Sequence, residues 1–136
     1  MTCPAERFAA EAERLAGAPF RLHGRDPATG LDCLGLACCA LDRAGLRSVS
    51  PAGYSLRSIA IERQLACVAL SGFAAADGAI ERGDMVLVRP GPAQHHLLIA
   101  LGDDRFVHAH AGLCRVILQT GLSGWPVLHH WRLAQP

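Results

Sequence analysis

The sequence predicts an α+β domain in which N-terminal helices pack on a C-terminal antiparallel β-sheet. Two observations support this fold class. The first half contains stretches with helical periodicity, and after Gly72 short apolar runs alternate with turn signals. Helices followed by hairpin-linked strands are typical of α+β domains. With 136 residues, 51% of them hydrophobic, residues 1–136 are long enough to form one domain with its own core.

The first helix is predicted over residues 5–15 and ends before Gly17 and Pro19, which interrupt helical structure. Residues 20–30 form a polar loop rich in Gly, Arg, Asp and Pro. A second helix is predicted over residues 33–44 because its apolar side chains recur at helical spacing, on one stripe. That stripe consists of Leu34, Ala37, Cys38 and Leu41.

A third helix is predicted over residues 55–70, with Ser55 as its N-cap, after a connection at residues 47–54. Beyond Gly72, turns that contain Gly, Pro or Asp separate short apolar runs. We expect these runs to form strands over residues 85–88, 97–101, 106–108, 115–118 and 127–133.

Composition excludes several classes of function. The formal net charge is only +1, so there is no field strong enough to suggest nucleic-acid binding. No apolar run reaches the length of a membrane span, and the N-terminus lacks the features of a signal peptide, so we expect cytoplasmic synthesis without export.

The six cysteines are interpreted as small core residues rather than disulfide partners. No metal-ligand spacing occurs, and we expect neither a metal nor a cofactor.

Cys33 is the strongest candidate for a catalytic residue. It lies in Gly30-Leu31-Asp32-Cys33-Leu34-Gly35-Leu36, where a Gly-containing turn meets the second predicted helix. The partial positive charge of a helix N-terminus stabilises a thiolate, so we expect a lowered pKa and a nucleophilic role. The alternative is that Cys33 is a structural cysteine buried in the core, with no catalytic role. Asp32 would either cap the helix or bind a substrate amine.

His96 and His108 are predicted to lie on adjacent antiparallel strands, where facing Cβ atoms are about 4.5–5.5 Å apart. An imidazole near Cys33 would take the thiol proton and return it to the leaving amine, and a second polar group would orient that imidazole. We assign the first role to His96 and the second to His108. His95 and His110 compete for these roles, and strand alternation sends His95 to the face opposite His96.

Several short motifs, in this order along the chain, resemble the NlpC-type cell-wall cysteine peptidases. The motifs are Ala-Pro-Phe at 18–20, Gly-Leu-Asp-Cys-Leu-Gly-Leu at 30–36, Arg-Gly-Asp-Met-Val at 82–86, His-Leu-Leu-Ile-Ala-Leu-Gly at 96–102, Val-His-Ala at 107–109 and Trp-Arg at 131–132. The resemblance implies a papain-like fold and a metal-independent Cys33–His96–His108 triad. It also implies cleavage of peptidoglycan stem peptides between D-γ-glutamyl and a diamino acid.

The resemblance also implies that Asp32 helps to bind substrate, and that Tyr54, the only tyrosine, lies near the cleft. His23, in the loop before the second helix, either lines the cleft or lies on the surface. The family usually has Ser directly after the nucleophile, whereas this chain has Leu34. We expect that substitution to remove a polar substrate contact and to alter specificity.

The Asp-Cys-Leu-Gly-Leu variant, the short domain and the absence of an export signal resemble phage-tail or gene-transfer-particle members of the family. The partners implied are a peptidoglycan peptide and phage-tail proteins. Two alternatives remain open. One is amidase or acyltransferase chemistry on the same triad, and the other is a non-catalytic tail-assembly module that retains the fold.

Overall fold

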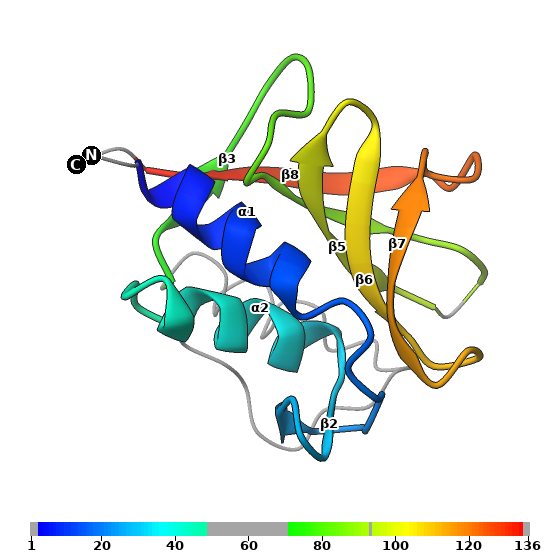
Figure 1. The fold of residues 1–136 in the computed structure, drawn as a ribbon. Helices are drawn as coiled ribbons and strands as arrows, with labels where there is room; N and C mark the ends of the chain where they lie inside the picture. The colour runs from blue at the N-terminus through cyan, green and yellow to red at the C-terminus, as the bar shows by residue number, and fades with distance from the viewer. Residues whose placement is uncertain (1–2, 49–70, 93, 135–136) are drawn as a thin grey trace.

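The computed structural model describes residues 3–48, 71–92 and 94–134. Two helices, α1 (Pro4–Arg14) and α2 (Cys33–Arg43), lie on one side of an antiparallel sheet with the strand order β3-β8-β4-β5-β6-β7 (Figure 1). This arrangement confirms the predicted α+β fold class. The strands are β3 (Phe73–Ala75), β4 (Met85–Val88), β5 (His96–Gly102), β6 (Arg105–His110), β7 (Arg115–Thr120) and β8 (Val127–Leu133).

The helices form close to where the sequence predicted them. Pro4 begins α1, where its missing N–H costs nothing, and Phe8, Ala9 and Ala12 form its fully buried face. Every residue from 34 to 41 of α2 is buried, so this helix is enclosed on all sides rather than along a single stripe. None of the described helices is both long and apolar enough to cross a bilayer.

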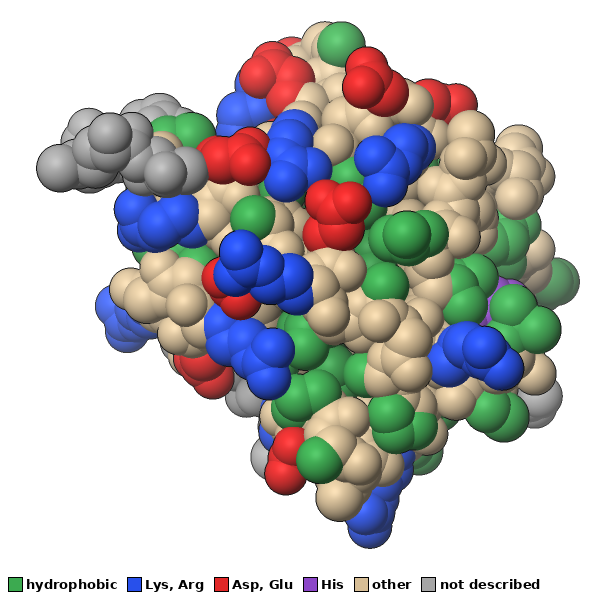
Figure 2. All heavy atoms as spheres, in the orientation of Figure 1, with side chains coloured by type: hydrophobic (Ala, Val, Ile, Leu, Met, Phe, Trp, Pro, Cys, Tyr) green, Lys and Arg blue, Asp and Glu red, His purple; other side chains and the backbone are tan. Residues whose placement is uncertain are grey.

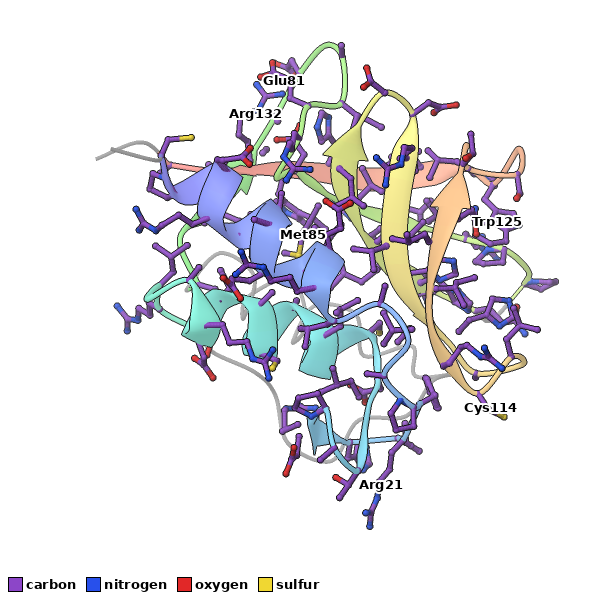
Figure 3. All side chains as sticks on the ribbon, in the orientation of Figure 1. Arg21, Glu81, Met85, Cys114, Trp125 and Arg132 are labelled. Atoms are coloured by element: carbon purple, nitrogen blue, oxygen red, sulfur yellow. The ribbon has the colours of Figure 1, made fainter. Side chains whose placement is uncertain are left out.

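The central strands are apolar on both sides because the sheet has a core on each face. Alternate residues such as Leu97, Ile99 and Val107 join the cluster under the helices. Met85 belongs to this helix-side cluster and lies between sheet and helices in Figure 3. The intervening residues pack into a second cluster on the far face, which consists of Val86, Val88, Leu98, Ala100 and Phe106, with Ile80, Leu122 and Trp125 against it.

Ion pairs attach α1 to the sheet. The Arg82 guanidinium lies 2.7 Å from Glu6 and also donates to the Leu101 carbonyl at 3.0 Å. Arg105 reaches Glu13 at 3.2 Å. Figure 2 shows basic and acidic side chains interspersed over this face of the molecule, so no single-sign patch forms there.

Some elements differ from the sequence-based expectation. The strand β3 and the small pair β1 (Arg25–Asp26) and β2 (Gly30–Leu31) were not predicted, because each is too short to show alternation. The third predicted helix, at residues 55–70, and most of the preceding connection lie outside the described residues. None of the described cysteines forms a disulfide, but Cys3 and Cys114 are exposed, so the interpretation of all six as core residues is wrong for these two.

Candidate active site

The N-terminus of α2 is held by Asp32. Its carboxylate is fully buried and accepts hydrogen bonds from the backbone N–H of Gly35 (2.8 Å) and of His23 (2.8 Å), and from the Arg25 guanidinium (3.3 Å). The bond to Gly35 confirms Asp32 as the N-cap of the helix. The other two bonds tie the preceding loop to the helix, so Asp32 sets the position of Cys33 from both sides.

Glycines let this loop approach the helix closely. A Cβ at Gly35 would lie only 1.9 Å from the carbonyl oxygen of Gly24. A Cβ at Gly24 would in turn lie 2.1 Å from the carbonyl oxygen of Gly30. The two backbones therefore meet at a distance that no other residue type permits.

Cys33 is the first residue of α2 and packs, partly buried, against the helix-side core. The sulfur interacts with the backbone N–H of Leu97 on β5. The Ala100 amide donates to Asp84 on the β4 side, and because amides alternate along a strand the Leu97 amide points toward β6. β5 pairs with β6 from Ile99, which lies opposite Val107. The Cys33 thiol therefore lies at the start of β5, where β5 is not yet paired with β6.

Burial raises the pKa of the Cys33 thiol to about 12. The Asp32 carboxylate raises it further, while hydrogen bonds from the amides of Leu97, Leu34 and Cys33 itself lower it. The lowered pKa expected from the helix N-terminus is therefore wrong for the free protein, because the desolvation of a thiolate outweighs the amides. The thiol is therefore protonated at neutral pH.

His96 is the residue directly before Leu97, and it begins β5. Burial lowers its pKa below the usual 6.5, and the neighbouring His110 adds to the effect. The ring is therefore neutral at pH 7 and able to accept a proton. Its Nδ1 is buried and has no hydrogen-bond partner within the described part of the chain. The edge of Trp125 packs on the ring, with centroids 5.9 Å apart.

His108 lies on β6, on the same sheet face as His96, with ring centroids 6.0 Å apart. It is fully buried, and its Nε2 lies 2.8 Å from the side-chain oxygen of Gln119 on β7. Burial lowers the pKa of His108 to about 4; the hydrogen bond with Gln119 opposes this effect, while His96 and His110 strengthen it. His108 therefore stays neutral across the physiological range.

The other candidates are placed as follows. His110 is half-buried, with its ring 5.6 Å from that of His108, and its Nδ1 accepts the Leu113 amide. His95 is half-buried just before β5. The His23 side chain is exposed. Tyr54 lies outside the described residues. Across residues 3–48, 71–92 and 94–134, no group of three His, Cys, Asp or Glu side chains is placed to hold a metal ion.

Sequence reasoning missed Gln119 and Trp125. Gln119 pairs with Phe106 and lies diagonally across from His108, which only the register of β6 and β7 reveals. Trp125 lies in the connection between β7 and β8 (Figure 3). Its ring contacts those of both His96 and His108. An isolated Trp in a turn-rich segment gives no sequence signal for such a contact.

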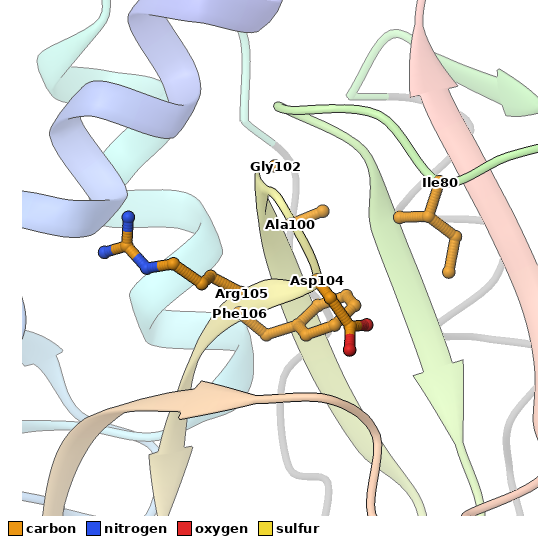
Figure 4. Close-up of a pocket in the computed structure, with 6 residues that line it drawn as sticks. All are labelled: Ile80, Ala100, Gly102, Asp104, Arg105 and Phe106. Carbon is orange, nitrogen blue, oxygen red and sulfur yellow. The ribbon is translucent and has the colours of Figure 1, made fainter.

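A cavity of about 230 Å³ lies at the other end of the sheet. It is lined by residues around the β5–β6 hairpin, including Gly102, Asp104 and Phe106, with Ile80 opposite (Figure 4). His96 is the first residue of β5 and Gly102 is the last, so this cavity is separate from the Cys33 region.

Together these groups suit acyl transfer. The thiol lies at the amide that follows His96, and His96 in turn contacts a second, neutral imidazole. The N–H groups of Cys33 and Leu34 at the start of α2 face the sulfur, where N–H donors can also stabilise an oxyanion. Leu34 is buried in the helix-side core, so the side chain after the thiol faces the protein interior.

Comparisons with known proteins place the fold among known structures. Residues 17–124 match the model of the NlpC/P60 family. NlpC2 from Trichomonas vaginalis is 20% identical, with a TM-score of 0.75; the match covers 100% of this chain and 48% of that one. The chain thus spans about half the length of that protein. A search of the curated proteins found no significant match.

Two shorter domains of known structure match over most of their own length. The NlpC/p60 domain of the peptidoglycan hydrolase SagA is 23% identical, with a TM-score of 0.58, and the match covers 85% of this chain and 88% of that one. The P60 domain of antigen MAP1204 from M. avium subspecies paratuberculosis is 21% identical, with a TM-score of 0.60, and the match covers 95% and 93%. At these identities the likeness establishes the fold.

Proposed function

The chain belongs to the NlpC/P60 family, and we propose that it is a cysteine peptidase that hydrolyses amide bonds in peptidoglycan stem peptides. The observation that carries this proposal is the placement of the Cys33 thiol at the amide of Leu97, the residue that directly follows the half-buried, neutral His96. A peptidoglycan hydrolase among the structural neighbours supports the substrate class. The proposed bond joins D-γ-glutamyl to a diamino acid.

In the proposed reaction, His96 removes the proton from Cys33 as the sulfur attacks the amide carbonyl. Concerted removal is required because burial keeps the pKa of the thiol at about 12, so almost no free thiolate exists at pH 7. Amides at the start of α2 stabilise the oxyanion, and the imidazolium of His96 protonates the leaving amine. Water, activated by His96, then hydrolyses the acyl-enzyme. His108 orients His96 throughout.

We propose distinct parts for the predicted substrate-binding residues. Asp32 already accepts bonds from Gly35, His23 and Arg25, so a substrate amine would have to displace Arg25 to reach it. Its main contribution is to hold the loop and helix that frame Cys33. His23 is exposed in that loop, and we propose that it contacts the peptide substrate, as does Tyr54.

Association with a phage-like particle is also part of the proposal, and the resemblance of the 32–36 segment supports it. The protein would open the cell wall locally as a particle component. Mass spectrometry of purified tail particles tests this directly. Detection of the chain at constant stoichiometry supports it, and its absence from intact particles contradicts it.

The peptidase activity is tested with purified muropeptides and the variant Cys33→Ala, with Cys114→Ser as the matched control because that cysteine is exposed. Wild type and control should release fragments with a new amine on the diamino acid, whereas Cys33→Ala should release none while keeping its circular dichroism. Equal activity in Cys33→Ala rules out the thiol mechanism. Released ammonia or intact stem peptide would instead indicate an amidase. An inert wild-type protein would indicate a non-catalytic module.

A further inference from the structure

The side-chain amide of Gln119 has a defined orientation. Its Nε2 donates to the carbonyl oxygen of Gly121 at 2.9 Å and to Ser123 Oγ at 3.4 Å. A backbone carbonyl can only accept, so the NH₂ end of the amide must face Gly121. The oxygen of the amide therefore faces His108, 2.8 Å from its Nε2. An amide oxygen can only accept, so His108 must carry its proton on Nε2.

This assignment determines the other ring nitrogen. A neutral imidazole carries a single N–H, so Nδ1 of His108 presents a bare lone pair. That atom is buried and has no hydrogen-bond partner within the described residues. The ring lies on the same face as His96, and the edge of Trp125 covers both rings. Burial keeps the pKa of His108 at about 4, so the lone pair is not lost to protonation near neutral pH.

We infer that Gln119 is a positioning residue that fixes the Nε2–H tautomer of His108, so that His108 offers a hydrogen-bond acceptor to His96. This inference rests on the proposed peptidase function. When His96 takes the proton from Cys33, it becomes an imidazolium with two N–H groups. The bare Nδ1 of His108 can accept the second one. With the opposite tautomer, His108 would direct an N–H at the imidazolium and destabilise it.

Gln119→Leu removes the oxygen that accepts from His108 and keeps nearly the same side-chain size. Gln119→Glu keeps an acceptor oxygen at this position. Thr120→Val is the matched control, because Thr120 is the next residue on β7, exposed and on the opposite face. We expect Gln119→Leu to lower kcat about 10- to 100-fold with little change in KM, the same scale as the loss of a hydrogen-bond partner that orients a metal-binding histidine. Gln119→Glu keeps an acceptor for His108 but loses the donor to the Gly121 carbonyl, so it should retain more of kcat than Gln119→Leu, and Thr120→Val should match wild type.

The second measurement is ¹⁵N NMR of His108, which needs no substrate. Wild type should show the Nε2–H tautomer, and Gln119→Leu should show a mixture of both tautomers. A wild-type Nδ1–H tautomer overturns the inference. So does an unchanged kcat in Gln119→Leu, even if Cys33→Ala remains inactive and the proposed function stands. If wild type hydrolyses no muropeptide, the proposed function fails, and the NMR spectrum still decides the tautomer.

Discussion

Replacing Gly35 with Ala tests whether the close contact between loop and helix positions the thiol. The new Cβ would lie 1.9 Å from the Gly24 carbonyl oxygen, about 1 Å inside the 3.0 Å that real Cβ contacts respect. Ala normally stabilises a helix interior by about 1 kcal/mol relative to Gly. Overpacking costs about 1–3 kcal/mol. Gly24 cannot yield easily because it is itself pressed against Gly30, so the cost should be near the upper end.

We therefore expect Gly35→Ala to lower the free energy of unfolding by about 1–2 kcal/mol after the helix gain is subtracted. Muropeptide hydrolysis should fall as well, because Cys33 lies two residues away in the same turn. Urea unfolding followed by circular dichroism measures the first effect. Gly91→Ala is the control, since its Cβ would meet only the flexible end of Gln94 at 3.3 Å. A Gly35→Ala protein as stable as wild type would refute the reasoning.

Three further predictions concern ionisation. Because burial lowers the pKa of His96, the acid limb of kcat/KM should have its midpoint below pH 6.5, and a midpoint above that value would contradict a buried base. At pH 7 iodoacetamide should label the exposed Cys114 before Cys33, as measured by peptide mass spectrometry; rapid labelling of Cys33 would mean that its thiol is not buried. Burial opposes ionisation of Asp84, but hydrogen bonds, chiefly from Arg132, hold its pKa below 3.8. Its stabilising effect is therefore present above pH 3.8 and lost as the pH falls through the folded-state pKa. Asp84→Asn should lower Tm at pH 7 and approach wild type in acid, and parallel Tm curves would disprove this.

The sequence predicted the elements that have a strong periodic signal. β4 and β8 begin and end where the apolar runs at 85–88 and 127–133 do, and α2 begins at Cys33 as expected. The segment around β3 was missed because three residues cannot show alternation. The cap formed by Asp32 was predictable because Asp at the start of an apolar helical run has a specific local role.

Properties that depend on packing were not predictable. The pKa of Cys33 depends on burial between helix and sheet, which no local pattern encodes, so the sequence suggested the wrong direction of shift. The contacts of Gln119 and Trp125 depend on strand register and on the path of a connection. Likewise, the ion pairs of Asp84 with His130 and Arg132 join residues more than forty positions apart.

The thiol and the imidazoles belong to different layers of the molecule. Cys33 packs with the helix-side core, whereas His96 and His108 share the far face with Trp125, and the sulfur interacts with the Leu97 amide, at the end of β5 where its pairing with β6 has not yet begun. Under the proposed mechanism, a chain with a complete sheet but with α2 not docked on it would have no peptidase activity. Enzymatic activity would then measure the docking of the helices on the sheet, the last step of folding. Circular dichroism reports secondary structure and would not detect that step. The same separation would keep nascent or misfolded copies from hydrolysing anything before the domain is complete.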